Sequence, residues 1–131
     1  MSKESPLISI VEDDEFLRAS LRRLMRSFGY TVEAFPSAVD FLAFPGHDRT
    51  ACLIADINMP MMTGLELYHR LIEAGRKIPT ILITAYPDDA VRGGALKDGV
   101  LGYLNKPFND DNLLRYVRMA LNDPSPAREP S

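Results

Sequence analysis

Residues 53–64 read Leu53-Ile54-Ala55-Asp56-Ile57-Asn58-Met59-Pro60-Met61-Met62-Thr63-Gly64. An apolar run ends at the carboxylate of Asp56, and a loop that contains Pro60 and Gly64 follows at once. This pattern predicts a buried strand that places one acid at the edge of a sheet. In open α/β sheets, ligands bind in the crevice beyond the carboxyl ends of the strands. Asp56 is therefore the first candidate for a functional residue.

Three other apolar runs lead to polar side chains. Leu7–Val11 is followed by the acid cluster Glu12-Asp13-Asp14-Glu15. Residues 100–104 are followed closely by Lys106, and residues 79–84 end at Thr84. Carboxylates, one lysine and one hydroxyl at strand ends indicate a site for metal-assisted phosphoryl chemistry.

The apolar pattern predicts five strands that alternate with five helices. The strands are expected at residues 7–11, 30–35, 51–55, 79–84 and 100–104. Such alternation predicts βαβ units, a parallel sheet and helices on both of its faces. Residues 45–50 are expected to form a loop, and Ile72 is expected on the inward side of the third helix. Gly93-Gly94 should soften the fourth helix, because each glycine costs about 1 kcal/mol relative to alanine.

Composition and charge argue against several classes of function. The 131 residues are 46% apolar and 25% charged, which is typical of one globular domain. A net charge of −3 gives no electrostatic case for a nucleic acid or an anionic membrane as partner. Four arginines at helical spacing are expected to form a solvated helix face: Arg18, Arg22, Arg23 and Arg26.

The same composition predicts a cytoplasmic protein. No apolar run approaches the roughly 20 residues that a membrane span requires. The polar start of the chain is not followed by a signal-peptide core. The one cysteine, Cys52, lies in an apolar run and is expected to be a buried thiol in a reducing compartment.

The residues at the strand ends suit one chemistry. Mg²⁺ prefers hard oxygen ligands, which Asp13, Asp56 and a main-chain carbonyl just past Asp56 would supply, and Mn²⁺ would accept the same set. A carboxylate can attack a phosphoryl group to give an aspartyl phosphate. Lys106 would neutralise phosphoryl charge, and the hydroxyl of Thr84 could donate to a phosphoryl oxygen.

Each of these residues also has a simpler structural interpretation. Adjacent acids at a strand-to-helix junction usually cap the helix. A single threonine at a strand end is more often a satisfied turn residue, and a single lysine is more often solvated. Only their joint placement at four strand ends favours a functional site.

Four segments of the chain resemble the motifs of response-regulator receiver domains, the phospho-acceptor modules of two-component signalling. They are Val11-Glu12-Asp13-Asp14-Glu15, residues 56–64, Ile83-Thr84-Ala85 and Tyr103-Leu104-Asn105-Lys106-Pro107-Phe108. The resemblance covers residues 5–122 and implies a flavodoxin-like, doubly wound (βα)5 fold with strand order 2-1-3-4-5. Residues 123–131, rich in Pro and Ser, are expected to be a tail or the start of a linker.

The resemblance also implies a role for each acid. Asp56 resembles the aspartate that is phosphorylated. Glu12 and Asp13 resemble the acidic pair, with Asp13 as the direct Mg²⁺ ligand and Glu12 reaching the metal through water. Asn58 would lend its main-chain carbonyl to the same ion. Glu12 departs from the commoner aspartate at its position.

Four further positions receive roles in the same way. Thr84 resembles the switch hydroxyl, and Lys106 resembles the phosphate-contacting lysine, with a cis bond to Pro107. Tyr103 resembles the aromatic switch residue, although a tyrosine at the edge of the core with its hydroxyl in water would look the same. Tyr86 occupies a position that tunes access of water to the acyl phosphate. We hypothesise that Tyr86 slows hydrolysis, and a Tyr86→Ala phosphate lifetime that is unchanged or longer would contradict this.

The implied partner is a sensor histidine kinase or a phosphotransfer protein. Phosphorylation adds roughly −1.5 to −2 charges. The resemblance implies that Tyr103 then turns inward and changes the face formed by the fourth helix, fifth strand and fifth helix, which is also the expected homodimer surface. Residues 35–42 resemble receivers joined to helix-turn-helix output domains. Regulation of transcription would then pass through an output domain or a partner, without direct nucleic-acid contact by this domain.

Two competing functions remain open. A phosphatase of the haloacid-dehalogenase type also forms an aspartyl phosphate, but it requires a second acid two residues after the nucleophile, where this chain has Asn58. A nucleotide- or flavin-binding module could share the fold, but no glycine-rich phosphate-binding motif is present. We therefore expect no turnover enzyme, only catalysis of the chain's own phosphorylation and dephosphorylation.

Overall fold

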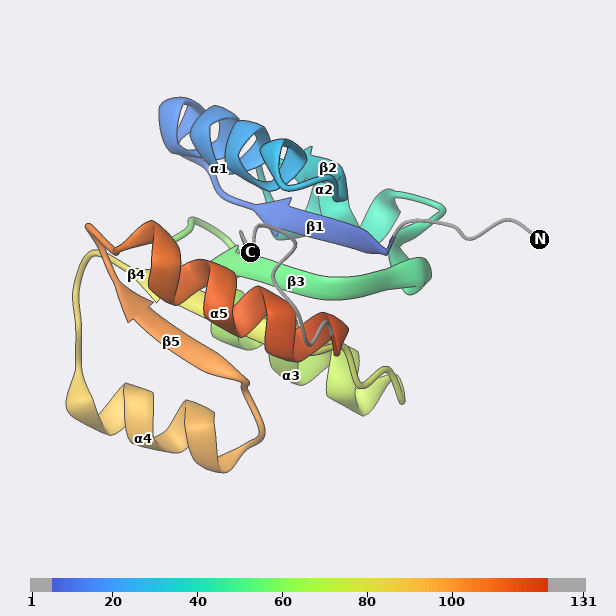
Figure 1. The fold of residues 1–131 in the computed structure, drawn as a ribbon. Coiled ribbons are helices and arrows are strands. Elements are labelled where there is room, and N and C mark those ends of the chain that lie inside the picture. The colour runs from blue at the N-terminus through green and yellow to red at the C-terminus, as the bar shows by residue number, and fades with distance from the viewer. Residues whose placement is uncertain (1–5, 123–131) are drawn as a thin grey trace.

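The computed structural model describes residues 6–122, which form five strands and five α-helices (Figure 1). The strands are β1 Leu7–Val11, β2 Thr31–Phe35, β3 Thr50–Asp56, β4 Thr80–Thr84 and β5 Gly102–Asn105. The helices are α1 Glu15–Ser27, α2 Ala38–Ala43, α3 Gly64–Glu73, α4 Asp89–Lys97 and α5 Asp110–Leu121. The tail predicted at residues 123–131 lies outside the described residues.

The five strands form one parallel sheet in the order β2-β1-β3-β4-β5, which confirms the predicted flavodoxin-like topology. The order reverses between β1 and β3, because the chain first adds β2 on one side of β1 and then β3 on the other. The register pairs Val11 with Ala55, and Asp56 with Ile83. The residues that follow β1 and β3 therefore emerge together, beside the switch point of the sheet.

Two apolar cores cover the two faces of this sheet. Helices α1 and α5 pack on one face, where Met25 and Val117 lie in the same buried cluster as Ile8. Helices α2, α3 and α4 pack on the other face, where Phe41 and Leu67 lie in a cluster with other strand residues. The inner strands β1, β3 and β4 are almost continuous apolar runs because both of their faces are buried, whereas the edge strand β2 alternates and exposes Thr31 and Glu33.

Side-chain caps fix where the helices begin. The carboxylate of Asp14 accepts hydrogen bonds from the first turn of α1, as predicted for Asp13 or Asp14. Thr63 and Glu66 form a reciprocal capping box at the start of α3. These caps hold the loops after β1 and β3, from which the candidate site is built.

Three local predictions were wrong. The segment expected as a loop contains a 3-10 helix at His47–Arg49, where the His47 ring bonds to the carbonyl of Phe44. The fifth strand begins at Gly102, two residues later than expected, because Gly99 turns the chain with a φ of 110°. Ile72 is 38% exposed, since Leu67 and Leu71 already fill the inward side of α3.

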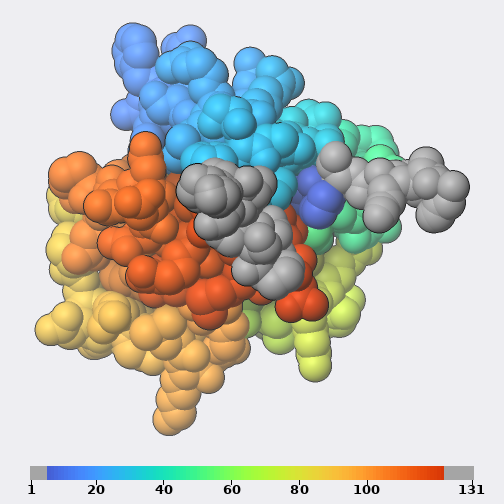
Figure 2. Space-filling model, viewed as in Figure 1, coloured from blue at the N-terminus to red at the C-terminus, as the bar shows by residue number. Residues whose placement is uncertain are grey.

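Helix α4 is held by few buried side chains. It lies at the outer edge of the fold beside β5 (Figure 1), and Ala95 is its only buried residue. A Cβ at Gly93 or Gly94 would meet no atom within 4 Å, so packing does not explain either glycine. On the face in Figure 2, α4 forms the corner below α5. Among the described residues, no helix is long and apolar enough to cross a membrane.

Candidate functional site

Asp56 is the last residue of β3 and is 2% exposed. Its Oδ1 accepts a hydrogen bond from the Asn58 backbone N–H at 3.0 Å, and its Oδ2 lies 3.3 Å from Lys106 Nζ. Gly64 allows the start of α3 to approach, because a Cβ there would lie 2.5 Å from the carbonyl oxygen of Asp56. Both carboxylate oxygens of Asp56 therefore have defined partners at the sheet edge.

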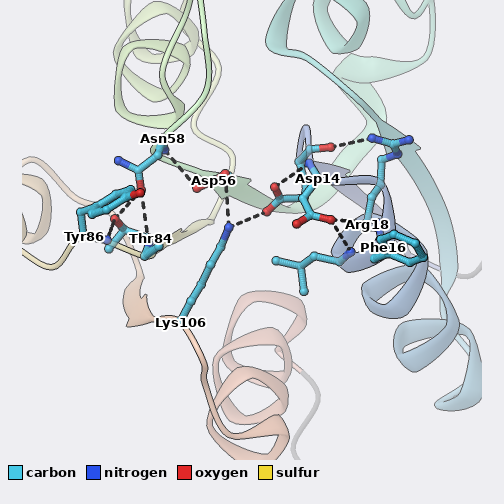
Figure 3. A network of polar contacts seen from close by, with 11 residues as sticks. Asp14, Phe16, Arg18, Asp56, Asn58, Thr84, Tyr86 and Lys106 are labelled. Carbon is cyan, nitrogen blue, oxygen red and sulfur yellow. Dashed lines mark hydrogen bonds and ion pairs between the residues drawn. The ribbon is translucent and has the colours of Figure 1, made fainter.

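Lys106 projects into the site from the loop after β5 (Figure 3). Its backbone N–H donates to the carbonyl of Thr84 at 2.7 Å, and its bond to Pro107 is cis, as predicted. Burial alone would lower the pKa of Lys106, but the charges of Glu12 and Asp56 outweigh burial and raise it. The ammonium therefore stays charged between two carboxylates.

Glu12 is fully buried immediately after β1. One carboxylate oxygen accepts from the Asp14 backbone N–H at 2.9 Å, and the other lies 3.1 Å from Lys106 Nζ without a directed hydrogen bond. Burial raises the pKa of Glu12 from 4.5 to about 7, and the nearby charge of Asp56 acts in the same direction. This second oxygen is a buried acceptor without a directed hydrogen bond, so it can accept one more bond.

Three carboxylates form a cluster that suits a hard cation. Glu12, Asp13 and Asp56 each offer an oxygen, and these atoms all lie within 4.8 Å of one another. Glu12 and Asp56 are buried, whereas Asp13 is exposed at the mouth of the site. The all-oxygen donor set and the incompletely satisfied Glu12 oxygen fit Mg²⁺ or Mn²⁺.

Thr84 ends β4, is 1% exposed and points its hydroxyl toward Asn58. The hydroxyl donates to Asn58 Oδ1 at 2.6 Å and accepts from the Tyr86 backbone N–H at 2.9 Å. The Ala85 N–H lies 3.3 Å from the same Asn58 oxygen. Figure 3 shows this group on the opposite side of Asp56 from Asp14. The sequence placed Thr84 at the site but gave no sign of this side-chain bond.

The two tyrosines assigned by resemblance lie in different surroundings. Tyr103 is 6% exposed and belongs to the core cluster on the α4 side of the sheet, together with Ala95. Its ring is thus already inside the fold. Tyr86 is 73% exposed in the loop after β4, and only its backbone N–H contacts Thr84.

Two features near the site were missed from the sequence, one at Arg18 and one at Met61. The Arg18 guanidinium donates to the Glu12 carbonyl at 2.9 Å and thereby holds the exit of β1. Its place among other arginines had suggested only a solvated helix face. Met61 adopts a φ of 72° in the loop after β3 and is 90% exposed, which nothing in the sequence indicated.

Comparison with known proteins shows the family. The family model of the response regulator receiver domain matches residues 8–118. Response regulator protein TmoT of Ectopseudomonas mendocina is 38% identical over 121 residues, which cover 92% of this chain and 55% of TmoT. Transcriptional regulatory protein FixJ of Rhizobium meliloti is 34% identical over 113 residues, covering 86% of this chain and 55% of FixJ.

Solved structures agree with these relatives. The crystal structure of a response regulator receiver protein from Burkholderia phymatum is 40% identical, with a TM-score of 0.76 over 89% of this chain and 95% of that one. The chain spans about half the length of the curated relatives named above. It belongs to the response-regulator receiver domain family, whose members are signalling modules of two-component systems.

Proposed function

We propose that Asp56 accepts a phosphoryl group from a sensor histidine kinase or a phosphotransfer protein. A carboxylate oxygen of Asp56 attacks phosphorus while the bond from phosphorus to the donor imidazole nitrogen breaks, and the imidazole leaves with the bonding electrons. The product is an acyl phosphate on Asp56. The observation that carries this proposal is the position of Asp56, held beside Lys106 and within an acid cluster at the switch point of the sheet.

Charge neutralisation is the main requirement of such a transfer. Lys106 Nζ, 3.3 Å from Asp56, supplies one positive charge beside the acceptor oxygen. Asp13, Asp56 and the main-chain carbonyl of Asn58 would hold Mg²⁺ or Mn²⁺ directly, and Glu12 would bind it through water. When bound, the ion would neutralise phosphoryl oxygens and screen the carboxylates from one another.

The phosphoryl group would change the conformation of the face made by α4, β5 and α5. In this proposal Thr84 and Lys106 turn toward the new oxygens, and α4 and the buried ring of Tyr103 repack in response. An open hollow on this face is lined by Arg92, Tyr103 and Asn112. The same face is our candidate for a homodimer surface. The chain would act in the cytoplasm and regulate transcription through an output domain or partner.

Two features favour signalling over turnover. Asn58 occupies the place of a second acid, and its side-chain oxygen is engaged by Thr84. A carboxamide has no proton acidic enough to give to a leaving group, so Asn58 cannot act as a general acid. Tyr86 has an exposed ring beside the site, so we keep the proposal that it shields the acyl phosphate from water.

The test is labelling by acetyl phosphate in the presence of Mg²⁺, followed by intact-protein mass spectrometry. We expect one phosphoryl group per chain and none on Asp56→Asn. Asp48→Asn is the matched control, because Asp48 lies in the 3-10 helix that precedes β3, at the opposite end of that strand from Asp56. Repeated turnover of phosphate esters by the wild-type chain would instead favour a phosphatase.

A further inference from the structure

The side chain of Asn58 holds the Thr84 hydroxyl in a position where it cannot serve Asp56. A threonine hydroxyl has a single hydrogen, and here that hydrogen is directed to Asn58 Oδ1 at 2.6 Å. The hydroxyl oxygen in turn accepts from the Tyr86 N–H. Any donation from Thr84 to a phosphoryl oxygen on Asp56 therefore requires the bond to Asn58 to break first.

Asn58 contacts the acceptor and the hydroxyl at the same time. Its backbone N–H bonds to Asp56 Oδ1 at 3.0 Å, while its side-chain oxygen takes the hydrogen of Thr84. The Ala85 N–H, 3.3 Å from the same side-chain oxygen, adds a second tie to the loop after β4. The loops that follow β3 and β4 are thus joined by one amide side chain, at the point where the phosphoryl group would arrive.

We propose that the Asn58 side chain is a latch that stabilises the unphosphorylated position of Thr84 and the loop after β4. The inference rests on the proposed function, because it concerns the response of Thr84 to a phosphoryl group. Asn58 is a positioning residue here: its side chain acts on the acceptor site through Thr84. The main-chain carbonyl proposed to face the metal is a separate group and is retained in every variant at this position.

A latch and a simple structural bond predict opposite changes in the affinity for a phosphoryl mimic when the Asn58 side chain is removed. A hydrogen bond of this type shifts a two-state equilibrium by roughly two- to tenfold. Removing the acceptor should free Thr84 and favour the phosphorylated-like state by that factor. If the bond only orders the site, its removal should loosen the loop and weaken binding of a phosphoryl mimic. Asn58 is exposed, so its truncation leaves both apolar cores untouched.

The chain is first freed of metal, and beryllofluoride, a phosphoryl mimic, is then added together with Mg²⁺. We expect Asn58→Ala to bind beryllofluoride about two- to tenfold more tightly than wild type. In a Thr84→Val background, where no hydroxyl remains to be held, the same Asn58→Ala change should leave the affinity unaltered. Calorimetry measures both arms, and thermal melting confirms that each variant is folded.

A second readout is taken on the variant without Mg²⁺ or the mimic, and the wild-type beryllofluoride complex serves only as the reference. In the metal-free chain, Asn58→Ala should move the backbone amide resonances of Ala85 and Tyr86 toward their positions in the beryllofluoride complex. Weaker or equal binding by Asn58→Ala, or an equal gain in the Thr84→Val background, would overturn the latch. If wild type binds no beryllofluoride and takes no phosphoryl group from acetyl phosphate, the proposed function fails instead.

Discussion

Lys106 Nζ lies 3.3 Å from Asp56 Oδ2, and its pKa is raised by the acids around it although burial opposes this. A permanent cation thus sits beside the proposed acceptor oxygen. Lys106→Met should reduce the rate of Asp56 labelling by acetyl phosphate about 100-fold, the usual cost of removing one charge-stabilising group. Lys77→Met, which changes an exposed lysine in the loop after α3, is the control.

Labelling rates of the two variants can be compared by intact mass over time. Equal rates for Lys106→Met and Lys77→Met would show that the ammonium contributes nothing to the transfer. A loss of labelling accompanied by a collapsed melting transition would point to folding, so circular dichroism accompanies the assay.

The pH dependence of stability should report the buried Glu12. Its pKa is raised from 4.5 to about 7, chiefly by burial. Between these values the folded chain binds more protons than the unfolded chain, so this contribution to stability is full below pH 4.5 and is lost as pH rises toward 7. Without metal, the stability of Glu12→Gln should change with pH by about 3 kcal/mol less than that of wild type across this window.

Urea unfolding at several pH values in the presence of a chelator measures this difference. Glutamine keeps the shape of the side chain and an acceptor for the Asp14 N–H. Parallel pH profiles for wild type and Glu12→Gln would mean that Glu12 has an ordinary pKa in the folded chain.

Binding of Mg²⁺ should raise stability through the acid cluster. At a concentration 100 times its Kd, a ligand of the folded state stabilises by about 2.7 kcal/mol. Asp13→Asn removes the exposed carboxylate of the cluster and should abolish most of this gain. Asp14→Asn is a close control, because asparagine preserves the cap of α1 while removing a neighbouring charge.

Thermal melts with and without Mg²⁺ separate the two variants. A general effect of negative charge predicts equal losses for Asp13→Asn and Asp14→Asn. A specific site predicts that only Asp13→Asn loses the response.

Helix α4 should be the easiest helix to stabilise. The position of Gly94 is exposed and open, so Gly94→Ala should raise the free energy of unfolding by about 0.5–1 kcal/mol. Gly64→Ala is the contrasting change, because its Cβ would lie 2.5 Å from the Asp56 carbonyl oxygen and should destabilise the chain. Hydrogen exchange should show less protection in α4 than in α1, with Gly94→Ala narrowing the gap. Equal protection in wild type would contradict the softness of α4.

The fold was predictable because its inner strands β1, β3 and β4 are buried on both faces. Apolar runs and glycines that end helices, such as Gly29 and Gly99, indicate the five strands and five α-helices of residues 6–122. The short 3-10 helix at His47–Arg49 was not predictable, because it depends on a side-chain bond to Phe44 and carries no apolar period. The sequence also contains the capping-box pair Thr63 and Glu66, which would have predicted where α3 begins.

The site was predictable only as a set of strand ends. Alternation of strands and helices brings Asp56, Thr84 and Lys106 to one edge of the sheet, whatever their side chains do there. The choice of hydrogen-bond partner at this edge depends on side-chain rotamers. The bond from the Thr84 hydroxyl to the Asn58 side chain could therefore not be foreseen. The buried state of Tyr103 depends in the same way on the packing of α4.

The most direct test of the central claim is to locate the phosphoryl group. The chain is labelled with acetyl phosphate and Mg²⁺, the acyl phosphate is reduced with borohydride, and peptides are sequenced by mass spectrometry. The account predicts that Asp56 is the residue converted to homoserine, at no more than one site per chain, and that Asp56→Asn yields none. Conversion of Asp13 or another acid, or labelling that survives in Asp56→Asn, would contradict it.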